Sequence, residues 1–319
     1  PTGIAAALAA GRAGARVIFA DEDFLIGGRL NAETFEVEGQ PGSQWAAQLV
    51  TELNSLSNVR LMPRTSVYGS FDHGIFGAVE RMTDQLLGTL GKPRQVLWRI
   101  YSKRAILCAG ATERSIAFGN NDRPGVMLAG SVRAYVNRWG VAPGKRVAVF
   151  TNNDDGWRTA LDLISKGINI SAVIDTRSQR PTFDLPGVKI VMGGRIINSS
   201  GRKCLTTLLL ADGQSIKADC LAVSGGWNPN VQLSCHQRGK PVWRDDIAAF
   251  VPGRDLPVGM EVAGAANGAL TLAAALGQGH NAGNAAAIAI GYNPSGIPAP
   301  KAEDEASGII GFWRVAECK

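Results

Sequence analysis

The chain has 319 residues, of which 45% are hydrophobic, 19% are charged and 39 are glycine. That length exceeds one ordinary domain, and the composition is typical of a soluble α/β protein with many tight turns. The net charge of +6 is scattered along the sequence and forms no basic tract, which argues against a nucleic-acid partner.

The beginning of the sequence predicts a helix followed by a buried strand. Residues 2–13 carry small and apolar residues at helical spacing, and residues 15–21 (ARVIFAD) form a β-rich run that ends on an acid. The latter part of a Rossmann fingerprint would place its residues at Gly3, Ala7, Gly14, Val17 and Asp21. The first strand and the first two glycines of that fingerprint are absent, so a ligand-free helix and strand stay an alternative.

An acidic run follows this strand. Asp21 lies where the fingerprint acid holds ribose hydroxyls, and Glu22 and Asp23 extend the run. These carboxylates would repel a 2′-phosphate, so we expect a ligand like NAD or FAD and not NADP.

A glycine turn comes next. Gly27 and Gly28 permit close backbone approach, and Arg29 is a candidate for contact with a phosphate. The alternative is an exposed turn with a solvated arginine.

Short strands occupy the next part of the sequence. A strand within residues 63–68 carries Val67, and in two-dinucleotide oxidoreductases the equivalent strand offers backbone groups to the adenine. Residues 74–80 and 95–101 predict a small β-meander. The run 104–110 (RAILCAG) ends in Ala109 and Gly110, small residues that would let the following loop press on a ligand.

A second β-α-β rhythm begins near residue 145. We expect a strand at 146–150, a helix at 157–166 and a strand at 168–175. The intervening loop, 151–156 (TNNDDG), has polar bulk and two carboxylates where a phosphate cradle needs glycines. We therefore interpret this unit as a degenerate nucleotide-binding domain with a structural role.

The last strand-to-helix turn bears on the choice of cofactor. A strand at 261–264 precedes a turn at Asn267 and Gly268 and a long helix at 269–290. Flavoprotein reductases of this build usually carry an aspartate in that turn to hold the ribityl chain of FAD. Here Ala265 stands in an acid-free turn, which favours NAD over FAD.

No other cluster predicts catalysis or metal binding. The five cysteines form no CxxC pair, which argues against structural zinc and suits a reducing compartment. The three histidines are isolated. No apolar run approaches the roughly 20 residues that span a bilayer, so we expect a cytoplasmic protein with no membrane partner.

Together these patterns predict a doubly wound α/β protein of the FAD/NAD(P)-binding, Rossmann-like type, with central parallel sheets and two dinucleotide-type domains. We expect the first domain to be discontinuous, with residues 1–115 and 255–295, to bind NAD and to lack its first strand. The second should occupy residues 140–250.

Two stretches carry a specific resemblance. Residues 108–154 (CAGATERS to FTNND) and 262–279 (VAGAANGALTLAAALGQG) are similar to the alpha subunit of heterotetrameric sarcosine oxidase. Subunits of opine oxidase, dye-linked proline dehydrogenase and hydrogen cyanide synthase resemble it as well. The end of the chain, 311–319 (GFWRVAECK), looks like the linker before a folate-binding domain, so residues 296–319 are expected to be a linker.

The resemblance implies an oxidoreductase that acts on CH–NH groups with oxygen as acceptor. In this family the first site of the alpha subunit holds NAD, and the amine is oxidised at FAD on the beta subunit. FMN lies at the alpha–beta interface, and folate on the C-terminal domain of alpha captures the one-carbon product. The implied partners are beta, gamma and delta subunits, and no catalytic residue is expected on this chain. The residues that would surround NAD are Thr2, Asp21, Glu22, Asp23, Arg29, Val67, Ala265, Leu270 and Thr271.

Two alternatives stay open: a free-standing, FAD-dependent reductase that uses NADH, and a subunit of a related opine-, proline- or glycine-oxidising dehydrogenase. Because the glycine turn of the first fingerprint is absent, we expect the 319-residue chain alone to retain no tightly bound dinucleotide and to oxidise no amine. If the chain does retain a dinucleotide, we expect most of the binding contacts to come from Arg29, Gly268 and Thr271.

Overall fold

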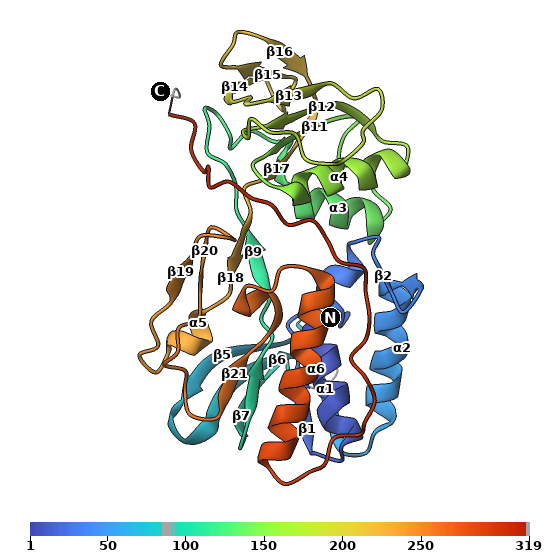
Figure 1. Cartoon of the computed structure of the whole chain (residues 1–319), viewed down its shortest axis with the longest axis vertical. Helices are drawn as coiled ribbons and strands as arrows, with labels where there is room; N and C mark the ends of the chain where they lie inside the picture. Colours follow the sequence, from blue (N-terminus) through green and yellow to red (C-terminus); the bar gives the residue numbers. More distant parts are fainter. Residues whose placement is uncertain (85–90, 92, 317–319) are drawn as a thin grey trace.

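The computed structural model describes residues 1–84, 91 and 93–316. Its elements gather in two lobes (Figure 1). The first lobe contains the elements up to β8 (Ala105–Leu107) and the returning β21 (Met260–Val262) and α6 (Leu272–Ala289). The second lobe contains the elements from β10 (Val126–Leu128) to β17 (Cys220–Ser224). How these lobes divide into independently folding domains stays a prediction.

Parallel strands form the centre of the first lobe. Strand β1 (Val17–Ala20) pairs with β4 (Val59–Met62), and β8 pairs with β21, in two separate parallel ribbons. Helices α1 (Thr2–Arg12) and α2 (Gly42–Ser55) pack on β1 and β4. The apolar core of this lobe joins α1, α2 and α6 through side chains such as Leu8, Leu53 and Leu276.

Two glycines bring α6 unusually close to α1. A Cβ atom on Gly279 would lie 2.3 Å from the carbonyl oxygen of Thr2, and one on Gly283 would lie 2.3 Å from that of Ala6. Backbone atoms cannot yield as a flexible side chain can. The alanine- and glycine-rich sequence of both helices is therefore what permits this contact.

We predict that Gly283→Ala lowers the free energy of unfolding by about 1–3 kcal/mol, because the new methyl group meets the backbone of α1. Urea denaturation measures this change. Gly277→Ala is the matched control on the same helix, since its Cβ meets nothing within 4 Å. The control should be neutral or stabilise by up to about 1 kcal/mol; equal effects of the two substitutions would contradict the close-packing argument.

The remainder of the first lobe is a β-meander, as expected. Strands β5 (Thr65–Phe71), β6 (Ile75–Arg81) and β7 (Gln95–Tyr101) pair antiparallel in chain order. The short elements around it and in the loops are η1 (Gly28–Asn31), β2 (Glu36–Val37), β3 (Gln40–Pro41), η2 (Asp72–Gly74) and η3 (Gly264–Asn267).

The second lobe contains a parallel sheet of five strands in the order β10-β17-β11-β12-β13. The expected β-α-β unit is β11 (Arg146–Thr151), α4 (Asp154–Ser165) and β12 (Asn169–Asp175), followed by β13 (Ile190–Met192). Helix α3 (Ala129–Asn137) packs beside α4 on one face of the sheet. An antiparallel meander covers the other face, with β14 (Ile196–Ser200), β15 (Thr207–Leu210) and β16 (Ser215–Lys217).

Two strands connect the lobes. Strand β9 (Ala111–Glu113) pairs antiparallel with β18 (Trp227–Pro229), and both run between the lobes in Figure 1. Beyond them lie α5 (Gln232–Cys235) and the pair β19 (Val242–Arg244) and β20 (Ala249–Val251).

The segment after α6, residues 293–316, returns along both lobes (Figure 1). It forms isolated β-bridges between Ala302 and Val37, Ile309 and Asn153, and Arg314 and Ala117. Val315 is fully buried in the core of the second lobe. This segment, named the tail from here on and expected as a linker, therefore packs on the rest of the chain.

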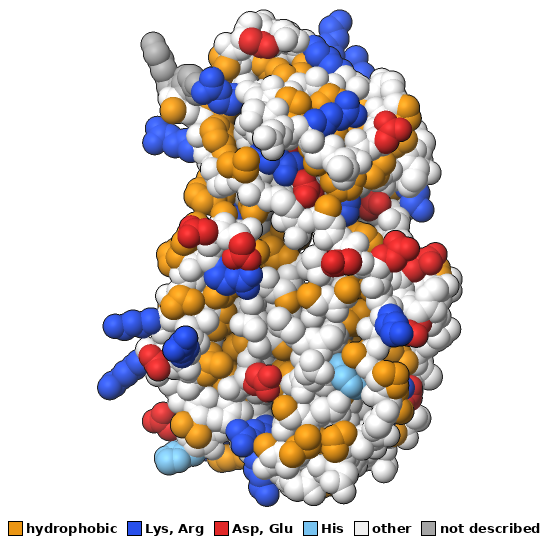
Figure 2. Space-filling view, viewed as in Figure 1, with side chains coloured by type: hydrophobic (Ala, Val, Ile, Leu, Met, Phe, Trp, Pro, Cys, Tyr) orange, Lys and Arg blue, Asp and Glu red, His pale blue; other side chains and the backbone are white. Residues whose placement is uncertain are grey.

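The surface agrees with the scattered charge of the sequence. Figure 2 shows basic and acidic side chains interspersed on the face it presents, without a continuous basic patch. Among the helices that the structure describes, none is long and apolar enough to cross a membrane.

Candidate functional site

The start of α1 is the first feature of the candidate site. Gly28 lies beside it in a left-handed conformation (φ 56°), and a Cβ there would be 3.5 Å from Pro1. Gly264 is also left-handed (φ 72°), and a Cβ there would lie 2.1 Å from the hydroxyl oxygen of Thr2. Helix α1 has no side-chain cap, so no side chain of the described residues binds its first N–H groups beside these glycine turns.

Asp21 directly follows β1 and forms the next part of the site. Its backbone N–H donates to Met62 and its carbonyl accepts from Thr65, which fixes the residue at the edge of the sheet. Oδ1 accepts from the N–H of Asp23 at 2.9 Å, and Oδ2 accepts no hydrogen bond from the described residues. Burial raises the pKa of Asp21, opposed by the hydrogen bond from Asp23. One carboxylate oxygen can therefore accept a ligand hydroxyl.

An open cleft of about 560 Å³ adjoins the acidic run. Its lining residues are Glu22, Asp23, Phe24, Arg64, Arg81 and Asp84. Arg81 donates to the carbonyl of Glu22 at 2.6 Å, and the guanidinium of Arg64 lies 5.2 Å from the centre of the Phe24 ring. The cleft has the volume of a small-ligand site, and its charge is mixed.

Asp23 itself is tied to the second lobe. Its two oxygens accept from Nη1 and Nη2 of Arg138 at 2.7 and 2.9 Å, and this hydrogen bonding lowers the pKa of Asp23. Arg138 is the residue after α3, and its guanidinium lies over the rings of Phe24 and Trp139. Thus the acidic run touches the lobe that was expected to bind no nucleotide.

Arg29 is also held by protein groups. It pairs with Glu33, donates to the carbonyl of Leu270 at 2.7 Å, and lies 3.2 Å from a carboxylate oxygen of Glu305. It is therefore no solvated surface arginine. Glu305 also accepts from the N–H of Leu272 at 2.7 Å, so the tail, η1 and the start of α6 meet at this point.

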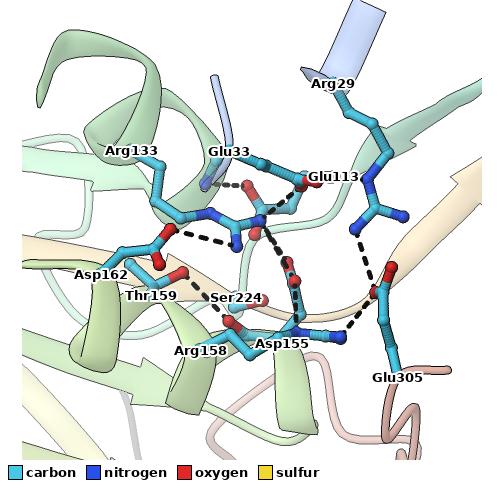
Figure 3. Close-up of polar contacts among 12 residues, drawn as sticks. Arg29, Glu33, Glu113, Arg133, Asp155, Arg158, Thr159, Asp162, Ser224 and Glu305 are labelled. Carbon is cyan, nitrogen blue, oxygen red and sulfur yellow. Dashed lines mark hydrogen bonds and ion pairs between the residues drawn. The ribbon is translucent and has the colours of Figure 1, made fainter. Parts of the chain in front are cut away.

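Buried ion pairs continue from Arg29 into the second lobe (Figure 3). Arg133 lies 2.9 Å from Glu33 and 3.1 Å from Asp155, and Arg158 lies 2.6 Å from Glu305. Burial opposes ionisation of Asp155, but the neighbouring arginines outweigh it and lower the pKa of that carboxyl. The cluster joins the loop after Gly28, helices α3 and α4, and the tail.

Glu113 is a carboxyl of this region that burial leaves protonated near neutral pH. It lies on β9, and its Oε2 accepts from the N–H of Gly130 at 2.7 Å. Burial raises its pKa to about 8, and the nearby Asp155 adds to the effect. Its other oxygen, Oε1, is buried without a hydrogen-bond partner among the described residues.

We predict that Glu113 makes the protein less stable as the pH rises from the carboxyl's ordinary pKa of 4.5 to its folded-state pKa of about 8. Across that window the folded state binds the extra proton, so stability should fall by about 1.4 kcal/mol per pH unit and level off above it. Glu113→Gln should abolish this slope. Thermal unfolding from about pH 5 to about pH 9 measures it, and parallel profiles for the two proteins would refute the assignment.

The corresponding loop of the second lobe is filled by its own side chains. Asn153 caps α4 by accepting from the N–H groups of Asp155 and Gly156. Asp154 pairs with Arg177 at 2.7 Å and accepts from the N–H of Gly308, a residue of the tail, at 2.7 Å. Groups that would face a phosphate in the first lobe therefore bind protein here.

The carboxylate of Asp175, the acid at the end of β12, is likewise bound by protein groups. It is fully buried, and it accepts from the indole of Trp157 and pairs with Arg177 at 2.7 and 2.8 Å. Its position matches that of Asp21 in the first lobe, yet its carboxylate oxygens are already bound.

The predicted residues fall in different parts of the site. Thr2, Gly3, Gly28, Ala265, Leu270 and Thr271 lie near the starts of α1 and α6. Gly268 has a left-handed backbone conformation (φ 77°), and a Cβ there would meet side chains of the β19–β20 region. It therefore forms a tight turn.

The other predicted residues lie on different elements. Val67 lies on β5, paired with Ala78. The carbonyls of Ala109 and Gly110 accept from the side chain and backbone of Asn230.

Cys108 packs behind the start of α1. A Cβ on Gly3 would lie 3.6 Å from it, and burial raises the pKa of the thiol to about 12. It is a protonated packing residue. In the part of the chain that the structure describes, no group of three His, Cys, Asp or Glu residues could hold a metal ion.

The fold is that of the FAD/NAD(P)-binding oxidoreductases. L-proline dehydrogenase from P. horikoshii superposes with a TM-score of 0.73 and 24% identity, over 92% of this chain and 54% of that one. Thioredoxin reductase from T. acidophilum gives 0.63 and 16%, over 91% and 94%. No family model matches the chain.

The sequence resemblance is confirmed as well. The chain is a homologue of the sarcosine oxidase alpha subunit of Rhizobium meliloti (strain 1021), with 41% identity over 304 residues. This match covers 94% of the chain but 30% of the relative. An opine oxidase subunit of Agrobacterium tumefaciens (strain Ach5) is 26% identical over 305 residues, with 83% of the chain and 59% of the relative covered.

Proposed function

We propose that this chain is the NAD-binding part of the alpha subunit of a cytoplasmic sarcosine oxidase complex. The observation that carries the proposal is the contrast between Asp21, which keeps one carboxylate oxygen free of partners among the described residues and lies beside an open cleft, and Asp175, whose oxygens are bound. The names of the homologues support the complex, and the fold supports a dinucleotide.

The residues around α1 fit NAD. The N–H groups of the first turn, with Thr2 and Gly3, would face the pyrophosphate, and Asp21 would accept a ribose hydroxyl. The cleft beside Asp23 would take the adenine. When bound, NAD supplies a nicotinamide ring that can carry a hydride.

The turn before α6 favours NAD over a flavin. Ala265 has no side-chain acceptor for a ribityl hydroxyl, and Thr271 caps α6 by accepting from the N–H of Ala274. The carboxylate of Glu305 accepts a hydrogen bond from the N–H of Leu272. At the start of α6, the N–H groups of Ala274 and Leu272 therefore already have hydrogen-bond acceptors from the protein.

Amine oxidation is assigned to other parts of the complex. In the proposed assembly sarcosine would be demethylated to glycine at FAD on the beta subunit, with FMN at the interface and folate on a further domain of alpha. Hydrogen peroxide and formaldehyde or methylene-folate would be the other products. Gamma and delta subunits would complete the complex. The relatives extend well beyond the matched region, in keeping with further domains in those proteins.

We predict that Asp21→Ala in the full-length subunit weakens NAD binding by about 1.5–3 kcal/mol, because charge-assisted hydrogen bonds to the ribose are lost. Isothermal titration calorimetry measures the affinity. Asp212→Ala, which removes an exposed carboxylate of the second lobe, is the control and should leave affinity unchanged. If Asp21→Ala binds NAD as the parent does, Asp21 is not part of the site.

A spectrum separates this proposal from a free-standing flavin reductase. We expect the full-length subunit, purified without partners, to show no flavin absorbance, and native mass spectrometry to detect NAD at up to one equivalent. Flavin absorbance bands at the intensity expected for one bound flavin would favour the reductase. Copurification of the partner subunits would supply the complex on which candidate amines can be assayed.

A further inference from the structure

We propose that Arg138, in the second lobe, is a positioning residue of the dinucleotide site in the first lobe. It fixes Asp23, and the backbone of Asp23 in turn fixes the carboxylate of Asp21. The proposal rests on the proposed function, because it needs Asp21 to hold a ribose.

The first step is the pair between Arg138 and Asp23. Both carboxylate oxygens are engaged, at 2.7 and 2.9 Å, in the parallel two-point geometry that a guanidinium makes with a carboxylate. The aromatic rings of Phe24 and Trp139 lie 4.9 and 4.8 Å from the guanidinium carbon. The arginine is thus restrained by two rings as well as by the carboxylate.

The second step leads from Asp23 to Asp21. The N–H of Asp23 donates to Oδ1 of Asp21 at 2.9 Å, and the carbonyl of Asp23 accepts from the N–H of Arg64 at 2.9 Å. With its side chain held by Arg138, Asp23 has little freedom to rotate. Oδ1 of Asp21 is consequently fixed, and Oδ2 is left to accept a hydroxyl in a defined direction.

Helix α3 holds the same loop at two further points. Arg133 pairs with Glu33, and Asn137 donates to the carbonyl of Ala32 at 2.9 Å. Arg133 and Asn137 are four residues apart, so they lie on one side of α3. This side of the second lobe therefore fastens the loop that follows Asp21.

An ordinary structural ion pair would make a different prediction. Loss of such a pair would lower stability and weaken every ligand alike. Loss of a positioning contact should instead remove the advantage that a ribose hydroxyl gives. The test is therefore the ratio of two dissociation constants, for NAD lacking the 2′-hydroxyl on its adenosine ribose and for NAD itself.

The experiment uses calorimetry on the full-length subunit with both ligands. The unsubstituted protein should prefer NAD over the deoxy ligand by about tenfold, the contribution of one charge-assisted hydrogen bond. In Arg138→Gln this ratio should fall to about two or less, with NAD bound about tenfold more weakly. Arg138→Lys, which keeps the charge but not the two-point contact, should give an intermediate ratio.

Arg12→Gln is the matched control. Arg12 makes a two-point pair with Glu52 at 2.6 and 2.7 Å, of similar exposure and away from Asp21. It should lower the melting temperature about as much as Arg138→Gln and leave the ratio unchanged. A double substitution completes the test: in an Asp21→Asn background, Arg138→Gln should have less than about a twofold further effect on NAD binding.

The outcomes separate the two proposals. If the parent binds no NAD, both the proposed function and the positioning role fail. If it binds NAD and Arg138→Gln keeps the ratio, or changes it by the same factor with and without Asp21, the positioning role alone is overturned. Should Arg138→Gln fold poorly, Arg138→Lys carries the test, since it keeps the charge and loses the two-point contact.

Discussion

Buried pairing between arginines and carboxylates is the interaction on which the arrangement of the two lobes depends. Glu33, Arg133 and Asp155 have almost no exposed side-chain surface, and each is within 3.1 Å of an opposite charge in the set. A buried charge without a partner is strongly destabilising, whereas a complete set is tolerated. The cluster therefore holds α3 and α4 of one lobe against the loop of the other, and this placement decides what lies beside Asp21.

The two lobes use one architecture in opposite ways. Each has a strand that ends on an acid and a helix that begins beside it. In the second lobe Arg177 and the tail bind Asp154 and Asp175, while in the first lobe Asp21 gives one oxygen to its own loop and keeps the other. The two acids therefore differ in which side chains and backbone groups surround them. Fold alone therefore does not assign a nucleotide to either lobe.

Much of this fold could be predicted from residue periodicity. Strands β1, β11 and β12 are largely apolar runs bounded by turns, and β7 alternates exposed and half-buried residues. The starts of α4 and α6 were expected near 157 and 269 but lie at Asp154 and Leu272, where Asn153 and Thr271 provide caps. Helices α2 and α3 were not predicted, and neither begins at a side-chain cap that would mark its start. The contacts of Arg138 with Asp23 and of Glu305 with Arg158 join residues more than 100 positions apart in the sequence, so no local pattern indicates them.

The β9–β18 ribbon has a mechanical consequence. Two antiparallel strands between lobes form a natural swivel, about which rigid bodies can turn with few changes in backbone dihedral angles. Here two sets of contacts away from the ribbon oppose a rotation of one lobe against the other. One is the arginine cluster, and the other is the tail, which forms bridges with Val37, Asn153 and Ala117. Torsion would have to break several buried contacts at once. The chain should therefore behave as one stiff body, in which the cleft beside Asp23 keeps a constant width.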